Sequence, residues 1–531
     1  MLDGSMMTFK VVDLFAGPGG LGEGFAAYGD GDKFGIVLSA EMEESAHRTL
    51  TLRSFFRRIQ GDEAALSAYY NFCHSEDAPH PSRVAKSAWN DATSEAHRLT
   101  LGEAEHNRQL DELLDKAKLR ADETVLIGGP PCQAYSLVGR ARNKGNEDYV
   151  AEDDHRHFLY LEYLRIVRKT QPAVFVMENV KGILSAKVGG RHVFQDILRD
   201  LSDPGEALGI PGGAKYTIHS LVAPISFRQG DDPAAIDVNS FIIESERFGI
   251  PQARHRVILL GVREDLPYDG GKFLKPGSAL SVDIAIGSLP QLRSRLSRGD
   301  SDSDWRDEVK KHAERLIKDA SKKDMELLVF EMQAACAKVG TVLETGGLRY
   351  SHQAEKKGLT AFHRWVQDPR LEVWLNSETR SHMSSDLARY FYTAAYGRAN
   401  GRTPKGHLEF ALKGLAPDHA NWESGKFVDR FRVQLKDLPS TTVTSHIAKD
   451  GHYFIHPDPV QCRSFTVREA ARLQTFPDNY FFQGNRTQQF HQVGNAVPSL
   501  LANKIAHVVY SILTGKTQQP TRARSKEPAT V

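Results

Sequence analysis

Residues 9–25 read FKVVDLFAGPGGLGEGF, a short apolar run of strand type that breaks directly into a glycine-rich loop. Glycines stand at positions 17, 19, 20, 22 and 24. Glycine adopts positive φ and lets a ligand approach the backbone, so such a loop after a strand is typical of sites for a dinucleotide, a mononucleotide or S-adenosylmethionine. A tight turn that binds nothing gives a similar pattern, so the loop alone leaves both interpretations open.

Further strand-type runs stand at 36–42, 125–129, 173–180 and 255–263, with helix-type stretches among them. Strands that are apolar throughout and alternate with helices predict a parallel sheet covered on both faces. Ligands of such sheets bind at the carboxyl ends of the strands. We therefore predict an α/β fold with a Rossmann-like sheet whose site lies at one edge.

The 531 residues are enough for two or three domains. The residue composition changes along the chain and suggests where the domains divide. Residues 85–121 are polar and helix-favouring, which predicts a helical insertion in a sheet domain spanning 8–264. Residues 265–435 mix charged helices with a basic, aromatic stretch, which predicts a second, smaller domain. Residues 514–531 are polar and contain proline, so we expect a disordered tail.

Composition narrows the partners and the compartment. The formal net charge is +1, so a nucleic-acid partner must meet a local basic surface rather than a basic field over the whole protein. No run of about 18 apolar residues exists and the N-terminus lacks a signal-peptide pattern, which predicts a cytoplasmic protein without a membrane partner. The four cysteines form no CxxC pair and have no histidines at zinc spacing, so we expect reduced thiols and no metal site.

Glu41 ends the second strand-type run, about 20 residues after the glycine loop. A carboxylate at this place can accept both hydroxyls of a ribose. A strand-end glutamate by itself is more often a solvated charge, but the glycine loop before it favours the binding interpretation.

Residues 125–132, VLIGGPPC, place a cysteine directly after two prolines. Each proline fixes φ and restricts the residue before it, so the segment is a rigid support that holds Cys132 at a strand end. An isolated cysteine there would usually be an inert buried residue, and a thiol with an ordinary pKa needs activation before it attacks. Cys132 is expected to share its crevice with the glycine loop, which favours a reactive thiol.

Charged residues mark the ends of two further runs. Glu178 and Asn179 end the run at 173–180, where a buried carboxyl group would favour the protonated form that donates a hydrogen bond. An exposed strand-end carboxylate is the alternative. Arg254 and Arg256 are two residues apart, so on a strand both would face one side and suit an oxygen-rich ligand. A solvated basic edge is equally compatible with that spacing.

Six segments occur in the order found in the DNA cytosine-5 methyltransferases: DLFAGPGG (13–20), GGPPCQAYS (128–136), ENV (178–180), QARHR (252–256), RSFTVREAARLQTFPD (463–478) and QVGNAVP (492–498). The chain resembles this family, and its bacterial and phage members more than the large eukaryotic maintenance enzymes. The resemblance implies a Rossmann-like S-adenosylmethionine-dependent methyltransferase sheet with a smaller target recognition domain in residues 265–435. It also implies that residues 436–513 return to the catalytic domain.

The resemblance implies catalytic roles at matching positions. Cys132 is similar to the nucleophile that attacks carbon 6 of a flipped cytosine, and Glu178 to the acid at ring nitrogen 3. Arg254 and Arg256 resemble the arginine pair near the cytosine carbonyl and the phosphate. The loop 133–155 is expected to close over the base.

The resemblance also implies a cofactor pocket for S-adenosyl-L-methionine. Glu41 matches the ribose carboxylate, Met42 takes the place of a contact to the adenine face, and Asp62 that of a contact to the adenine amino group. The whole implied pocket comprises Phe15, Ala16, Gly17, Pro18, Gly20, Leu21, Glu41, Met42, Asp62, Pro130, Asn495, Ala496 and Val497.

Double-stranded DNA is the implied partner of a monomeric enzyme, with a cognate restriction endonuclease acting separately. Candidates for groove or phosphate contacts are Arg380, Arg389, Arg398, Arg402, Lys405 and residues 445–451. For each of them a solvated basic surface is an alternative.

Two other functions stay open: a transfer-RNA methyltransferase of the same chemistry, and a DNA-binding regulator with a relic site. The large block at 265–435 argues against the first, and intact Cys132, Glu178 and Arg256 argue against the second.

Overall fold

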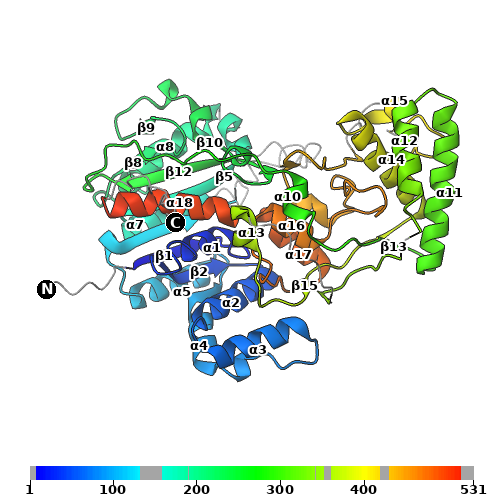
Figure 1. The fold of residues 1–531 in the computed structure, drawn as a ribbon. Helices are drawn as coiled ribbons and strands as arrows, with labels where there is room; N and C mark the ends of the chain where they lie inside the picture. The colour runs from blue at the N-terminus through cyan, green and yellow to red at the C-terminus, as the bar shows by residue number, and fades with distance from the viewer. Residues whose placement is uncertain are drawn as a thin grey trace, which may run out of the picture.

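The computed structural model describes residues 8–131, 158–188, 190–340, 342–351, 360–418, 422 and 430–515. Cys132, the expected closing loop 133–155 and residues 516–531 of the expected tail lie outside the described residues. Figure 1 shows a lobe built on a sheet with helices around it, and a helical lobe beside it.

The central sheet is built from β1 (Phe9–Leu14), β2 (Phe34–Glu41), β3 (Ala96–Arg98), β4 (Thr124–Gly128), β5 (Val174–Val180), β8 (Tyr216–His219), β9 (Ser226–Phe227), β10 (Ile242–Glu244) and β12 (His255–Arg263). The strand order is β3-β2-β1-β4-β5-β12-β8-β9, with β10 paired to β12. Strands β1 to β5 are mutually parallel, whereas β12 runs antiparallel to β5, β8 and β10.

All five predicted runs form strands of this sheet, but the prediction of a wholly parallel sheet is wrong on its β12 side. That prediction rested on apolarity, and apolar residues in a strand report burial on both faces rather than direction. β12 lies between β5 and β8 and opposes both, so it is as buried as a central parallel strand. The fold is therefore α/β with a mixed central sheet.

Helices cover both faces of the sheet. On one face lie α1 (Gly20–Ala26) and α18 (Ser499–Leu513), and on the other lie α5 (Ala104–Lys116), α7 (Phe158–Thr170) and α8 (Val193–Ser202). Because side chains alternate along a strand, β4 sends Val125 and Ile127 into the first core and Leu126 into the second. This arrangement is why its residues are apolar without alternation.

The C-terminal segment packs back onto the start of the sheet lobe. A Cβ atom at Gly24 in α1 would collide with Ala502 in α18, so glycine permits the close approach of the two helices. Arg486–Leu513 has the length and apolarity of a membrane span, but it forms two helices, α17 (Arg486–Asn495) and α18. The apolar side chains of α18 lie in the core against α1, which is the behaviour of a core helix.

The predicted helical insertion at 85–121 is an insertion only in part. It contains α4 (Lys86–Glu95) and α5, but also β3, which pairs with β2 and extends the sheet. β3 could not be predicted, because an edge strand of three residues is too short to show alternation. α4 and the preceding α3 (Glu63–His74) form a small core with Leu375 and Phe481, so this region supports the connection to the second lobe.

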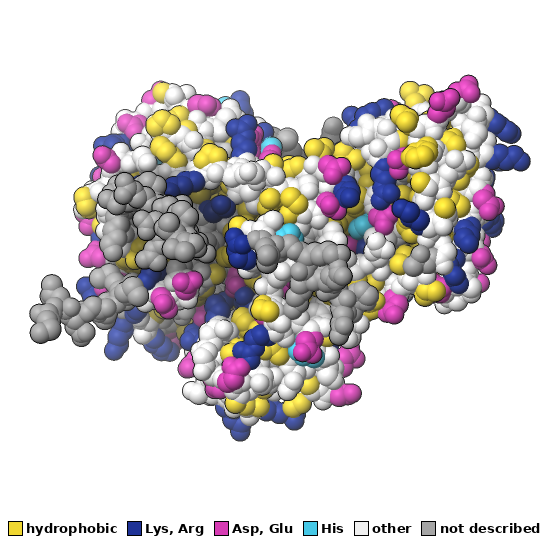
Figure 2. All heavy atoms as spheres, viewed as in Figure 1, with side chains coloured by type: hydrophobic (Ala, Val, Ile, Leu, Met, Phe, Trp, Pro, Cys, Tyr) yellow, Lys and Arg dark blue, Asp and Glu magenta, His cyan; other side chains and the backbone are white. Residues whose placement is uncertain are grey.

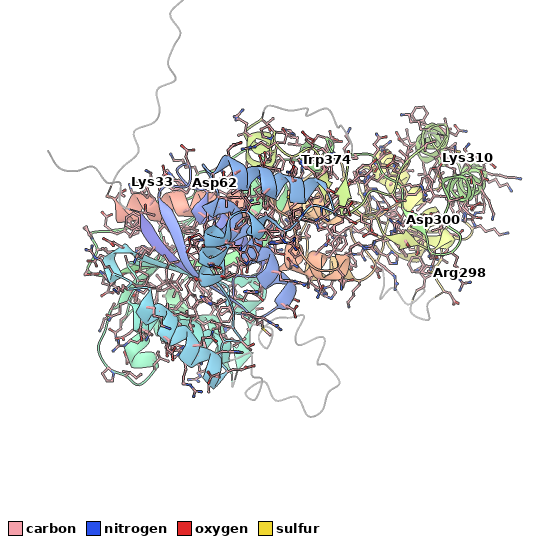
Figure 3. The ribbon with its side chains drawn as sticks, turned by 90° about the horizontal axis from the view of Figure 1, so that it is seen from below. Lys33, Asp62, Arg298, Asp300, Lys310 and Trp374 are labelled. Carbon is pink, nitrogen blue, oxygen red and sulfur yellow. The ribbon has the colours of Figure 1, made fainter. Side chains whose placement is uncertain are left out.

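The second lobe has a core of its own. Helices α11 (Asp302–Ser321), α12 (Glu326–Cys336) and α14 (Ser384–Asn400) pack against one another around it. On the face shown in Figure 2, basic and acidic side chains are interspersed over this lobe. Figure 3 shows Arg298, Asp300 and Lys310 on it, well away from Asp62 on the sheet lobe.

Short elements connect the two lobes. Two-residue strands pair as β11 (Gln252–Ala253) with β17 (Ser440–Thr441), β13 (Arg295–Leu296) with β16 (Ser381–His382), and β14 (Arg349–Tyr350) with β15 (Trp374–Leu375). The remaining α-helices named in the described residues are α2 (Glu44–Arg58), α9 (Pro204–Ala207), α10 (Val282–Ile286), α13 (Ala361–Val366), α15 (Gly406–Glu409) and α16 (Val467–Leu473).

Candidate active site

The glycine loop leaves β1 through an unusual backbone conformation. Phe15 has φ 56°, in the left-handed region that bulky residues rarely adopt, followed by Gly17 at 57° and Gly19 at 96°. Such strain persists where the surrounding structure enforces it, and it is common at ligand sites. Only these two of the five loop glycines have positive φ, and Gly20, Gly22 and Gly24 are instead positions where a side chain would collide with a neighbour.

Glu41 lies directly beside this loop. Its Oε2 accepts a hydrogen bond from Gly17 N at 2.8 Å, and its Oε1 accepts one from Glu43 N at 2.7 Å. Burial raises the pKa of this carboxyl group, and the two backbone donors partly offset that effect. Each carboxylate oxygen keeps a further acceptor site. The next residue, Met42, has 57% of its surface exposed, so its side chain is accessible to a ligand beside Glu41.

The returning segment supports the loop from behind. The Tyr480 hydroxyl donates a hydrogen bond to Pro18 O, and a Cβ at Gly20 would collide with Val497 O. Ala496 is buried next to it, and Asn495 is exposed at the end of α17. The structure therefore brings residues 495–497 against the glycine loop, although they are more than 470 positions apart in sequence.

Asp62 is not where an adenine contact requires it, so that expectation is wrong. It follows α2, which begins three residues after Glu41 and is 15 residues long, so about 22 Å of helix lies between Glu41 and Asp62 along the chain. Asp62 caps α3 by accepting a hydrogen bond from Ala65 N at 3.0 Å. The strand adjacent to Glu41 is β3, and Leu99 N just after it donates to Glu41 O at 3.0 Å. Residues after β3, which the sequence did not reveal, therefore border this side of the pocket.

The expected acid and one of the expected arginines lie where β5 and β12 pair. Glu178 is largely buried and forms an ion pair with Arg256, with 2.9 Å between Oε1 and Nε. A Cβ at Gly129 would lie 2.9 Å from Glu178 Oε2, so glycine is needed there to admit the carboxylate. The carboxyl group is buried as the first interpretation expected, but it has a charged partner. Burial lowers the pKa of Arg256, and the nearby Glu178 partly offsets this effect.

Asn179 ties this edge to the proline segment. Its side-chain nitrogen donates to Pro130 O at 3.2 Å, and its side-chain oxygen accepts from Val180 N at 2.8 Å. Pro130 is buried, and the described backbone continues to Pro131, one residue before Cys132. The segment that leads to the cysteine is therefore fixed against the strand that carries Glu178.

Arg254 does not face the same surroundings as Arg256. It is 2% exposed and lies between β11 and β12, where Nη1 donates to Val443 O at 2.7 Å and both terminal nitrogens donate to Gly494 O at 3.2 Å. The expectation that both arginines face one side assumed a continuous strand, and β12 begins only at His255. The oxygen-rich partner of Arg254 in this structure is the returning chain itself.

The arginines expected to contact DNA are engaged within the protein. Arg380 and Arg389 are buried and donate to backbone carbonyls, Arg398 pairs with Asp458 at 3.1 Å, and Arg402 pairs with Glu409 at 2.6 Å. Charge alone selected them, and charge does not tell whether a guanidinium meets water or a carbonyl. Of the expected contacts, Ser445 is partly exposed, and the exposed ones are Arg398, Arg402, Lys405, His446, Lys449 and Asp450.

Asp13 is a buried acid that the sequence reasoning missed. It stands in β1 beneath the glycine loop, and a Cβ at Gly22 would lie 2.7 Å from its Oδ2. Burial raises its pKa to about 8, although Arg57 acts in the opposite direction. Within the described residues no group of three or more His, Cys, Asp or Glu side chains is arranged to hold a metal ion.

Known proteins resemble this chain in sequence. The family model of C-5 cytosine-specific DNA methylases matches residues 82–222 and 235–511. The type II methyltransferase M.Bpa9945I of Bacillus paralicheniformis is 31% identical over 528 residues, covering 95% of this chain and 99% of its own. The DNA (cytosine-5-)-methyltransferase M.ApeKI of Aeropyrum pernix is 25% identical over 544 residues, covering 96% and 99%.

A solved structure agrees in fold. A prophage-encoded E. coli protein, described as a DNA modification methyltransferase, matches with a TM-score of 0.53 at 19% identity, covering 96% of this chain and all of its own. That likeness supports a Rossmann-like methyltransferase fold. With its family motifs matched over most of its length, the chain belongs to the C-5 cytosine-specific DNA methylases and is a DNA (cytosine-5-)-methyltransferase.

Proposed function

We propose that this enzyme transfers a methyl group from S-adenosyl-L-methionine to carbon 5 of a cytosine flipped out of double-stranded DNA, through a covalent bond between Cys132 and carbon 6. We also propose that it protects host DNA from a separate restriction endonuclease that reads the same site. The observation that carries the proposal is the edge of the sheet. Glu178, the proline segment before Cys132 and the loop beside Glu41 lie at the carboxyl ends of neighbouring parallel strands, and Arg256 joins Glu178 from the amino end of the antiparallel β12.

The glycine loop and Glu41 fit the cofactor. The two oxygens of Glu41 already accept backbone N–H groups, so the carboxylate is held in place with acceptor sites remaining for the two ribose hydroxyls. Phe15, Gly17 and Met42 would border the rest of the molecule. When bound, S-adenosyl-L-methionine would supply an electrophilic methyl group on a sulfonium sulfur, and the thioether S-adenosyl-L-homocysteine would be the product.

Cys132, Glu178 and Arg256 would together make carbon 5 of cytosine reactive enough to accept a methyl group. Carbon 5 is a poor nucleophile, and a bond from the Cys132 thiolate to carbon 6 makes it enamine-like and able to take the methyl group. Glu178, in its protonated form, would donate a hydrogen bond to ring nitrogen 3, which makes carbon 6 more electrophilic. Arg256 would hydrogen-bond the oxygen of the base and keep the Glu178 side chain in place. Loss of the carbon-5 proton to water then lets the electron pair expel the thiolate and restore the ring double bond.

The base must leave the helix for this chemistry. A thiol has to approach one face of the ring while an acid reaches its edge, and neither is possible for a stacked base. The Glu178–Arg256 pair retains about an eighth of its side-chain surface exposed, so the base edge can reach it from outside.

The test measures transfer of a labelled methyl group from the cofactor to duplex DNA and to transfer RNA. We expect transfer to DNA alone, and its loss in Cys132→Ala. The matched control is Cys336→Ala, because Cys336 lies in the helical lobe and is remote from the sheet edge. DNA containing 5-fluorocytosine should trap wild-type protein covalently and leave Cys132→Ala free. Methylation by Cys132→Ala at the wild-type rate, or transfer to transfer RNA, would overturn the proposal.

Bisulfite sequencing of DNA from cells that express the protein would identify the methylated site. If the methylated DNA resists cleavage by endonucleases that recognise the same site, the restriction-modification role is supported.

A further inference from the structure

Residues 443–451, VTSHIAKDG, form a segment that we name the recognition arch. It begins at the sheet edge, where Arg254 donates to Val443 O at 2.7 Å and Thr442 Oγ1 donates to Ala253 O at 2.7 Å. It ends at Gly451, whose φ is +75° and whose missing Cβ would lie 2.5 Å from Ser464 Oγ. The first end is therefore held by hydrogen bonds at the sheet edge, and the second end packs closely against Ser464.

Arg380 holds the middle of the recognition arch. Its guanidinium donates to Ile447 O, to Ala448 O at 3.2 Å and to Lys449 O at 3.0 Å, and it lies 4.3 Å from the centre of the Phe490 ring. Burial lowers the pKa of Arg380 to about 10, so the guanidinium is still charged at neutral pH. With 8% of its surface exposed, Arg380 is an internal clamp and offers little to an external ligand.

Lys449 is the cation on the outer side of this clamp. It is exposed at the surface. Lys449 is six positions after Val443 along the chain, so the two residues are at most about 22 Å apart. Lys449 therefore lies within about one turn of DNA, roughly 34 Å, of the sheet edge.

We propose that the recognition arch binds DNA beside the flipped base, that Lys449 contacts a phosphate, and that Arg380 is the positioning residue that fixes the arch for this contact. The inference rests on the proposed function, since it takes double-stranded DNA as the substrate. It assigns the basic stretch at Arg380 a supporting role instead of a direct contact.

Arg389 provides a matched control. It is also buried, donates to Leu415 O at 2.9 Å and Ala416 O at 3.2 Å, and lies 5.4 Å from the Phe431 ring. Its clamp is in the helical core of the second lobe and does not touch the recognition arch. Loss of either guanidinium removes a buried charge with carbonyl partners, but only Arg380 should affect the arch.

The experiment measures the dissociation constant of a duplex oligonucleotide carrying the methylated site across a series of salt concentrations, together with methylation kinetics. Lys449→Ala should lower the slope of log Kd against log salt by about 0.9, the value of one phosphate contact. Arg380→Met should lower it similarly and raise the KM for DNA about tenfold, while the KM for the cofactor changes less than about twofold. Arg380→Lys should be intermediate, and Arg389→Met should leave the slope unchanged.

Two results would overturn the inference: an unchanged salt slope in Lys449→Ala, or equal effects of Arg380→Met and Arg389→Met on DNA binding. If Arg380→Met does not fold, Arg380→Lys and Lys449→Ala decide the outcome. A wild-type enzyme that does not methylate DNA contradicts the proposed function instead, and this is seen before any variant is compared.

Discussion

The sheet edge and the helical lobe both contain buried arginines, but they use them differently. At the edge, Arg256 pairs with the carboxylate of Glu178, and the pair keeps part of its surface exposed. In the helical lobe, Arg389 gives its donors to carbonyls and to Asp386, and none of its polar surface is left for a ligand. The partner of an arginine, more than its position in a basic stretch, therefore distinguishes a chemical role from a structural one. Arg254 is the informative intermediate, because it lies at the edge but is bonded like Arg389.

The largest expected effect is the loss of activity on replacing Glu178, the partner of Arg256 at the sheet edge. Glu178→Gln keeps the shape of the side chain but removes the acid, so kcat should fall about 10³-fold. The melting temperature should change little, because Gln can still accept a hydrogen bond from Arg256. Single-turnover methylation with labelled cofactor measures the step directly. A kcat within tenfold of wild type would mean that Glu178 is not the acid.

Arg254→Met should instead act on stability. It leaves Val443 O and Gly494 O without their charged donor in a buried site, which should cost about 3 kcal/mol of unfolding free energy. Urea unfolding measures this loss, and the folded variant should retain kcat within about tenfold, because Arg256 and Glu178 are untouched. A normal unfolding free energy with a kcat reduced as far as in Glu178→Gln would place Arg254 with the chemical residues.

The same contrast explains which features could be predicted from the sequence. The ends of β1, β2 and β5 carry Phe15, Glu41 and Glu178, and a strand end fixes both the place and the direction of the next side chain. Asp62 was misplaced because sequence proximity to Glu41 does not account for the direction of α2, which carries the chain away from the site.

The features that could not be predicted from the sequence depend on contacts between residues far apart in the chain. The direction of β12 depends on pairing with β5 across 75 residues, and the role of Arg254 depends on carbonyls 189 and 240 positions away. Gly24 permits the packing of α1 against α18, and this role is visible only once both helices are in place. The local residue pattern predicts burial and turns. It does not predict which distant segment pairs with a strand or accepts a hydrogen bond from a side chain.

A smaller effect, dependent on pH, is expected at Asp13 beneath the glycine loop. Its folded pKa is raised to about 8 from an ordinary value of 3.8, so between these values the folded protein keeps a proton that the unfolded chain releases. Stability should therefore fall with rising pH across that window. The groups that face Asp13 are Arg57, which lowers its pKa, and Glu41 and Glu95, which raise it.

Asp13→Asn removes this titration. Relative to wild type, the variant should gain about 1 kcal/mol of unfolding free energy for each pH unit between pH 5 and 7, and the difference should be constant below pH 3. Chemical unfolding at a series of pH values measures it. A difference that does not change from pH 5 to 7 would show that Asp13 is ionised in the folded protein.

The smallest effect is expected at Arg402, which forms an ion pair with Glu409 on the surface of the helical lobe. Water and salt screen this pair, and holding two long side chains in one geometry costs conformational entropy. Arg402→Ala should therefore leave both the melting temperature and the rate of DNA methylation unchanged.

Arg389→Ala in the same lobe should lower the melting temperature clearly, because it leaves two carbonyl groups and Asp386 without a hydrogen-bond donor in a buried site. If the two variants lost equal stability, burial of the partner would not be what separates them. If Arg402→Ala instead weakened DNA binding and reduced its salt dependence, Arg402 would exchange Glu409 for a phosphate, and the lobe would present arginines to DNA after all.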